Sequence, residues 1–233
     1  MENFLSTFDY YISFIYLIST LGTLAYLRLP KESQKKRINR LLVGSLVLVF
    51  FYENLAYFLV SKHTVNSWVY LIFFHHFATC INLWIIQEYI LVKKRKWIVR
   101  LFIGSLLVLS GIPYLLGYIP FNDAGEISAL LGASFVIISS WIFFYELVLD
   151  DHYLELNPIR FSGFWIMTSY LFFYSGSFTI LISYSYLINN YLDIYYIVIE
   201  VTRFTALMLY VIYFLTLIEW KGLSQTKPTI SYE

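Results

Sequence analysis

Seven apolar runs, each long enough to cross a lipid bilayer, constrain the fold of this chain more than any other feature. A helix needs about 20 apolar residues to cross the ~30 Å hydrocarbon layer. Each run predicts a helix, because lipid offers no partner to an unpaired backbone N–H or C=O. The predicted helices cover approximately residues 8–28, 41–61, 68–92, 97–118, 126–148, 161–188 and 192–219. We therefore predict an all-α, polytopic bundle of seven transmembrane helices.

The composition agrees with a membrane protein and narrows its chemistry. Charged residues make up 13% of the 233-residue chain, against ~25% in soluble domains, which excludes a soluble monomer. Because the links between the runs are short, we predict one membrane domain over residues 1–223 and a short cytoplasmic tail over 224–233. The N-terminal segment lacks the basic region and cleavage site of a signal peptide, so the first run is expected to remain as a membrane helix. The single cysteine, Cys80, excludes an intramolecular disulfide.

The basic residues predict which way the bundle faces. Short cytoplasmic loops of membrane proteins are rich in Lys and Arg. Here 14 of the 16 basic residues fall in the first, third and fifth links and in the C-terminal tail. We therefore predict that the N-terminus lies outside and the C-terminus in the cytoplasm, with the protein in the cytoplasmic (inner) membrane. These loops are expected to bind anionic lipid heads and not nucleic acid, since no separate fold presents them.

Ionisable side chains lie at a similar depth in three of the predicted helices. Helix 41–61 carries Glu53, helix 68–92 carries two adjacent histidines, and helix 192–219 carries an acid and a base. At about 1.5 Å of rise per residue, these groups lie roughly 11–17 Å below the outer boundary. Charges at this depth need partners on other helices or water in a cavity. Together with nearby polar residues, the candidate ligand-binding residues are Glu53, His75, His76, Asn82, Tyr174, Glu200 and Arg203.

The acid and base of the last run, Glu200 and Arg203, lie within an otherwise apolar segment. Their spacing of three places both on one helical face, where they satisfy each other in part. A guanidinium has five donors, so we expect Glu53 to face Arg203 as well. If this layer binds a ligand, we expect a cavity that opens to the outer face between the second, third, sixth and seventh helices. Its expected lining is Glu53, His75 or His76, Tyr174, Glu200 and Arg203.

Four interpretations of this ionisable layer stay open. The groups can form a structural cluster that holds the second, third and seventh helices together. They can titrate in a proton-linked sensor or transporter, or Arg203 can hold an anionic small molecule. A set of Glu and His can also bind a transition metal, but no His-x-x-x-His or Glu-x-x-His pair occurs on one helix. We therefore predict no metal and no cofactor.

Two known seven-helix chemistries do not fit the residues present. A retinal Schiff base needs a lysine deep in the last helix, where the chain has none before Lys221. Zinc-dependent membrane hydrolases need several histidines around the metal. Apart from the adjacent pair, the chain has only His63 and His152, which fall in links on opposite sides of the predicted bundle.

Short motifs occur over most of the chain. They are a basic first link, Ser61-Lys62, Asn66, Glu126, the run Trp141 to Glu146, Phe164-Trp165 and Tyr174-Ser175-Gly176. In these motifs the chain resembles a family of uncharacterised seven-helix inner-membrane proteins of Bacteroidota. The resemblance implies a seven-helix fold in a bacterial inner membrane and implies no activity.

These observations favour a receptor-like or accessory sensor protein without enzymatic activity. Only about a dozen residues follow the last helix, so a signal is expected to pass to a cytoplasmic or membrane partner through the loops or the membrane face. The first alternative is a small-solute or proton-linked transporter, which the odd helix count and the lack of an inverted repeat disfavour. The second alternative is an intramembrane metal-dependent enzyme. No catalytic residue is predicted.

Overall fold

The computed structural model describes residues 2–64, 66–118, 120–150, 153, 156–220 and 223, and it places long helices over the predicted runs. Seven of its helices are long and apolar enough to cross a membrane, which confirms the all-α, seven-helix fold class. These spans are Tyr10–Arg28, Arg37–Ser61, Tyr70–Tyr89, Lys93–Leu115, Ala124–Leu149, Ser162–Ser183 and Leu192–Leu217. The chain thus has the architecture of a multi-pass membrane protein.

Five spans are single helices, and two are built from shorter segments in line. The single helices are α1 (Glu2–Arg28), α3 (Arg37–Ser61), α8 (Phe121–Leu149), α9 (Ser162–Asn190) and α10 (Leu192–Leu217). The third span consists of α4 (Ser67–Val69), η1 (Tyr70–Ala78) and α5 (Thr79–Tyr89), and the fourth of α6 (Lys93–Leu106), η2 (Leu107–Gly111) and α7 (Ile112–Leu115). Among the link residues that the structure describes, short helices are formed by α2 (Lys31–Lys35) and η4 (Pro158–Arg160).

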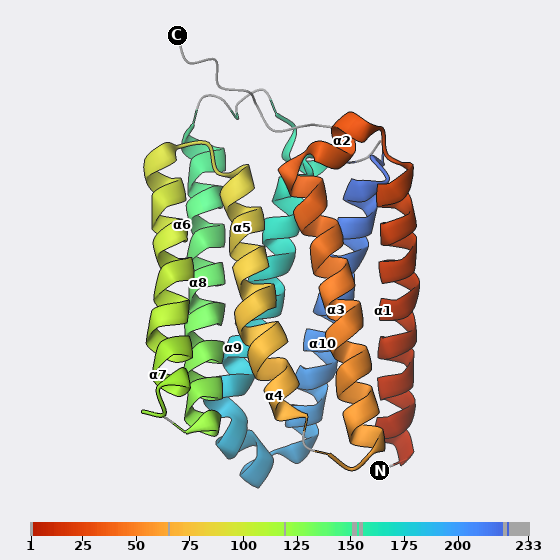
Figure 1. Ribbon diagram of the computed structural model, residues 1–233, viewed down its shortest axis with the longest axis vertical. Helices are drawn as coiled ribbons and strands as arrows, with labels where there is room; N and C mark the ends of the chain where they lie inside the picture. Colours follow the sequence, from red (N-terminus) through yellow and green to blue (C-terminus); the bar gives the residue numbers. More distant parts are fainter. Residues whose placement is uncertain are drawn as a thin grey trace.

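The spans stand nearly upright beside one another in a single bundle (Figure 1). On one side α1 packs against α3 and α10, and on the other α6 packs against α5 and α8. Between these groups, α5 contacts α3 and α8, while α9 contacts α8 and α10. We call the two ends of the bundle the α2 end and the α4 end, after the short helices that lie there (Figure 1). The α2 end is the one that we predict to be cytoplasmic.

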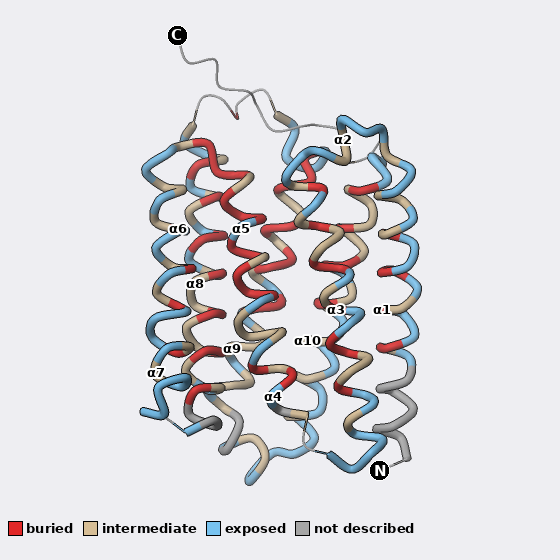
Figure 2. The backbone as a smooth tube through the Cα atoms, viewed as in Figure 1, coloured by how far each residue is buried: buried red, intermediate tan, exposed pale blue. Residues whose placement is uncertain are grey.

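Buried residues gather where the helices meet, and exposed residues face outward along the sides of the bundle (Figure 2). Many of the outward residues are large and apolar, among them Phe58, Leu115 and Trp141. Lipid tails solvate such side chains as well as a protein interior does, so this surface is suited to the hydrocarbon layer. Close packing between helices relies on small residues. A Cβ atom added at Gly176 of α9 would lie 2.9 Å from the hydroxyl oxygen of Thr202 on α10.

Two of the seven spans contain a π-helical segment, η1 in the third and η2 in the fourth. The sequence predicts a kink at Pro113, because proline lacks the backbone N–H that an α-helix needs. Pro113 lies in the first turn of α7, directly after η2. The span is irregular directly before Pro113, where it forms a π-helical turn instead of an α-helical one. Such turns are rare and are frequent at functional sites.

A buried carboxylate secures the α2 end. Glu146 of α8 is fully buried and accepts hydrogen bonds from the backbone N–H groups of Leu91 (2.7 Å) and Val92 (2.8 Å), in the link between α5 and α6. The guanidinium of Arg95 lies 3.1 Å from the same carboxylate. Close by, the Tyr153 hydroxyl donates to the carbonyl of Tyr89. Burial and the neighbouring acidic groups raise the pKa of Tyr153, which keeps this hydroxyl protonated as a donor.

Candidate functional site

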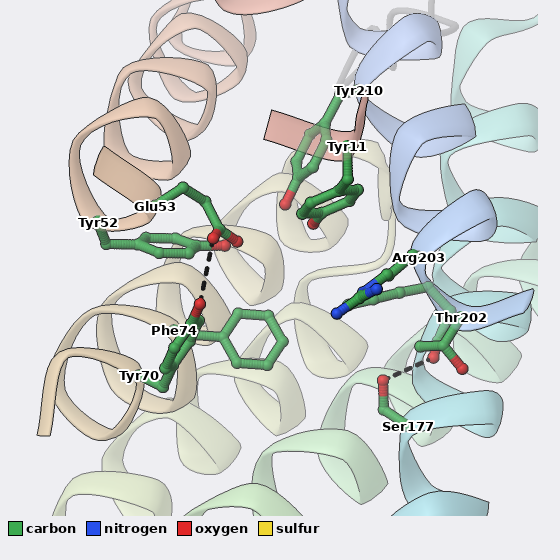
Figure 3. A pocket seen from close by; sticks show the side chains of 10 residues that line it. Tyr11, Tyr52, Glu53, Tyr70, Phe74, Ser177, Thr202, Arg203 and Tyr210 are labelled. Atoms are coloured by element: carbon green, nitrogen blue, oxygen red, sulfur yellow. Dashed lines mark hydrogen bonds between the residues drawn. The ribbon is translucent and has the colours of Figure 1, made fainter. Parts of the chain in front are cut away.

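A cavity of about 220 Å³ lies between five helical segments, α1, α3, η1, α9 and α10 (Figure 3). It is partly open, and its walls combine tyrosines, two phenylalanines, two hydroxyl side chains and two charged groups. The lining residues are Tyr11, Tyr52, Glu53, Tyr70, Phe74, Phe173, Ser177, Thr202, Arg203 and Tyr210. A cavity is therefore present among the second, third, sixth and seventh spans, and the first span also contributes to it. Its opening to the outer face stays a prediction.

Glu53 forms the acidic wall of the cavity. Its residue is 4% exposed, and its carboxylate accepts a hydrogen bond of 3.2 Å from the hydroxyl of Tyr70 on η1. A carboxylate has about four lone-pair positions, and this bond occupies one of them. Tyr70 thus fixes the orientation of the carboxylate while it leaves acceptor capacity directed at the cavity.

Arg203 forms the basic wall on the opposite side. Its guanidinium lies 2.6 Å from the carboxylate of Glu200, one turn earlier on α10, as the spacing of three predicts. The guanidinium carbon also lies 6.0 Å from the ring centroid of Tyr11, at the limit of a cation–π contact. The Glu200 side chain is 45% exposed and the Arg203 side chain 19%. The pair therefore extends from the outer surface of the bundle to the cavity wall.

The two charged walls face each other. Figure 3 shows the carboxylate of Glu53 and the guanidinium of Arg203 pointing toward one another across the cavity, from α3 and α10. Tyr11 and Tyr210 lie between them on one side and Phe74 on the other (Figure 3). The expectation that Glu53 faces Arg203 is met in this sense, with a cavity and not a closed contact between them.

Asn82 and Tyr174 belong to a different cluster. The amide of Asn82 donates to the Tyr174 hydroxyl (2.8 Å) and accepts from the hydroxyls of Tyr170 (3.1 Å) and Tyr213 (3.2 Å). The last two hydroxyls also contact each other. All four side chains are buried. This cluster ties α5, α9 and α10 together with its polar groups satisfied, which is the mark of a structural network.

His76 contacts the fourth and fifth spans and not the cavity. Its Nδ1 lies 2.8 Å from the carbonyl oxygen of Leu71, which assigns a proton to that nitrogen. Its Nε2 lies 3.1 Å from the hydroxyl of Ser110 on η2 and 3.5 Å from that of Ser128 on α8. The ring of His75 lies against Phe74, with 5.0 Å between centroids. Neither histidine is part of the described cavity lining.

The expected lining is thus corrected in part. Of its members, the cavity brings together Glu53 and Arg203, while Glu200 stands behind Arg203. The histidines and Tyr174 lie elsewhere, because equal depth along a helix does not fix the direction in which a side chain points. Sequence reasoning missed the tyrosines and hydroxyls of the wall. Their signal was weak, although Tyr210 follows Arg203 by seven residues and so shares its helical face.

Among the described residues, no three His, Cys, Asp or Glu side chains gather closely enough to hold a metal ion. No family model, no curated protein and no solved structure matches the chain. The resemblance to the seven-helix family of Bacteroidota therefore stays a prediction.

Proposed function

We propose that this protein is a receptor-like membrane protein that binds a small polar ligand in the Glu53–Arg203 cavity and passes the binding event to a partner. The observation that carries the proposal is the pair of opposite charges on facing walls of one cavity. Ionisable residues inside a membrane span are costly, and by default they mark a ligand or ion site. A ligand that contacts both walls ties α3 to α10 and favours the conformation in which they are close.

The π-helical segment η1 offers a route from the cavity to the rest of the bundle. It carries Tyr70, which bonds Glu53 at the cavity, and His76, which contacts Ser110 of η2 and Ser128 of α8. A shift of η1 on binding would therefore move groups on three other spans. An allosteric response requires an element with two arrangements, and we propose that η1 is that element.

The charge distribution supports an orientation with the α2 end in the cytoplasm. The first link, with Lys31 and Lys35, and the start of α6, with Lys93, lie at that end. Basic residues at a cytoplasmic face attract anionic lipid heads. We propose that the protein lies in the bacterial cytoplasmic membrane. We also propose that its α2 end contacts the signalling partner. The protein has no enzymatic activity in this proposal.

Native mass spectrometry of the purified protein tests the proposal. We expect a small molecule to co-purify with the wild type and to be lost from the double variant Glu53→Gln/Arg203→Gln, which removes both charges together. The control Glu126→Gln neutralises an exposed acid on α8, outside the cavity, and should retain the molecule. Equal retention in the double variant would contradict the proposal. If the protein carries the same molecule into proteoliposomes, it is a transporter and not a receptor.

A further inference from the structure

The two charged walls of the cavity differ in how far their charges are already compensated. The guanidinium of Arg203 lies 2.6 Å from the carboxylate of Glu200 and 6.0 Å from the ring centroid of Tyr11. The Arg203–Glu200 pair therefore adds no net charge to the cavity. Glu53 has a neutral partner, because the hydroxyl of Tyr70 donates to its carboxylate at 3.2 Å. Among the ion pairs of the described residues, none includes Glu53. The charged groups around the cavity thus sum to one carboxylate.

This buried carboxylate favours a ligand with a positive charge. Glu53 is almost completely buried, and a buried charge without a partner of opposite sign is strongly unfavourable. The bond from Tyr70 takes one of about four lone-pair positions, so the carboxylate can still accept hydrogen bonds from the N–H groups of an ammonium ion. A ligand with a negative charge would leave Glu53 uncompensated and would compete with Glu200 for Arg203.

Aromatic rings form most of the remaining lining. They are the rings of Tyr11, Tyr52, Tyr70, Phe74, Phe173 and Tyr210. The ring planes of Tyr52 and Tyr70 are 67° apart, and those of Phe74 and Phe173 are 73° apart, so the ring faces point in several directions. Figure 3 shows rings on both sides of the space between the charged walls, with Phe74 on one side and Tyr11 on the other. The negative faces of such rings attract a cation within about 6 Å. The aromatic walls and the carboxylate therefore favour the same sign of charge.

The volume and the placement of the walls limit the size of the ligand. The cavity of about 220 Å³ is smaller than the roughly 300–1,000 Å³ of sites for drug-sized molecules. The ligand is accordingly a compact molecule with a short apolar part. Glu53 lies on α3 and Tyr210 on α10, so a ligand that contacts both still ties these two helices together.

We propose that the cavity binds a small primary amine in its protonated form, with the ammonium group at Glu53 and the apolar part against Phe74 and Phe173. The ligand class rests on the proposed function, because it concerns the same cavity. Arg203 and Glu200 form one wall of this site as a neutral pair and do not bind the charge of the ligand.

Matched probes that differ in charge test the ligand class. The purified protein is held in an uncharged maltoside detergent, and binding of propylamine, isobutylamine and phenethylamine is measured by calorimetry at neutral pH, where these amines are protonated. Each amine is compared with the alcohol of the same carbon chain, which is neutral, and with the corresponding carboxylate, which is negative. We expect at least one amine to bind about 30-fold or more tightly than its alcohol and its carboxylate, as loss of a buried charge contact requires. The N-trimethyl derivative of that amine has no N–H donor and should bind more weakly than the amine.

Variants assign the ammonium group to Glu53 and to the rings. Glu53→Gln should weaken binding of the amine by about 30-fold or more and leave binding of the alcohol unaffected. Phe74→Leu keeps an apolar wall without a ring face, and it should weaken the amine about threefold or more relative to the alcohol. The control Glu126→Gln, outside the cavity, should bind as the wild type does. If a variant does not fold, the charge forms of each probe on the wild-type protein decide the question alone.

The outcomes separate the ligand class from the proposed function. Equal binding of the amines and their alcohols, or tighter binding of a carboxylate or an N-trimethyl derivative, would overturn the primary amine and leave a ligand-binding cavity. Co-purification of a molecule other than a positively charged primary amine would do the same. Co-purification of such an amine would support the ligand class even if no probe binds. If no probe binds and no molecule co-purifies, the proposed function fails together with the ligand class.

Discussion

Removal of the Glu146 carboxylate is expected to destabilise the bundle more than any other single loss of an ion pair described above. The two backbone hydrogen bonds that it accepts, from Leu91 and Val92, have a charged acceptor. Bonds of that kind contribute about 1.5–3 kcal/mol each. The contact with Arg95, whose side chain is partly exposed, adds less than ~1 kcal/mol. Glu146→Ala should therefore lower the free energy of unfolding by about 3–6 kcal/mol. Glu146→Gln, which keeps one acceptor oxygen, should lower it by roughly half as much.

The measurement is reversible unfolding in mixed micelles with increasing SDS, followed by circular dichroism. The matched control is Glu88→Gln, which breaks an ion pair of 3.2 Å with the half-exposed Arg37 at the same end of the bundle. Exposed pairs of this type contribute about 0–1 kcal/mol. The reasoning is refuted if Glu146→Ala and Glu88→Gln lower the free energy of unfolding equally, because burial and the two backbone bonds would then contribute nothing.

Three further changes test packing, the charged pair and the orientation. Gly176→Ala should lower the free energy of unfolding by about 1–3 kcal/mol, because the added Cβ would meet Thr202. The control Gly104→Ala has open space around it and should be neutral or stabilising in the same assay. Equal effects of the two substitutions would contradict the α9–α10 contact. Arg203→Gln should reduce thermal stability in detergent less when Glu200→Gln is present, because the double variant does not leave the Glu200 carboxylate without its ion-pair partner. Strictly additive losses would show that the pair is not coupled. A reporter that works only in the cytoplasm should be active when fused at the C-terminal end of the chain and inactive in the α9–α10 link, and the reverse pattern would overturn the orientation.

The spans could be predicted from the sequence because their cause is local. Each needs only enough consecutive apolar residues to cross the hydrocarbon layer, and α10 accordingly begins at the predicted residue, Leu192, and ends at Leu217, two residues before the predicted limit. Glu53 and Arg203 could be singled out for a related reason. A charged residue in an apolar segment can be recognised from the sequence without knowledge of the tertiary structure.

The directions of the side chains could not be predicted, because they depend on the rotation of each helix about its axis. An α-helix advances 100° per residue, but this value does not apply to the two histidines. They lie in η1, where each turn holds more residues than an α-helical turn. Asn82 follows η1 along the same span, so the wider turns of η1 also change the direction in which Asn82 points. His76 consequently points to Ser110 and Ser128, and Asn82 to the tyrosine cluster.

The π-helical turns also determine where this chain can change its length during evolution. Deletion of one residue from a regular α-helix rotates everything beyond it by about 100°, which would turn lipid-facing side chains of a span into the protein interior. A π-helical turn closes i→i+5 hydrogen bonds and so holds one residue more than an α-helical turn. Loss of one residue from η2, Leu107–Gly111, restores an α-helical turn and leaves the faces of α6 and α7 in place. Within the spans, one-residue deletions are therefore expected to be tolerated in η2 and η1 and to be purged by selection elsewhere.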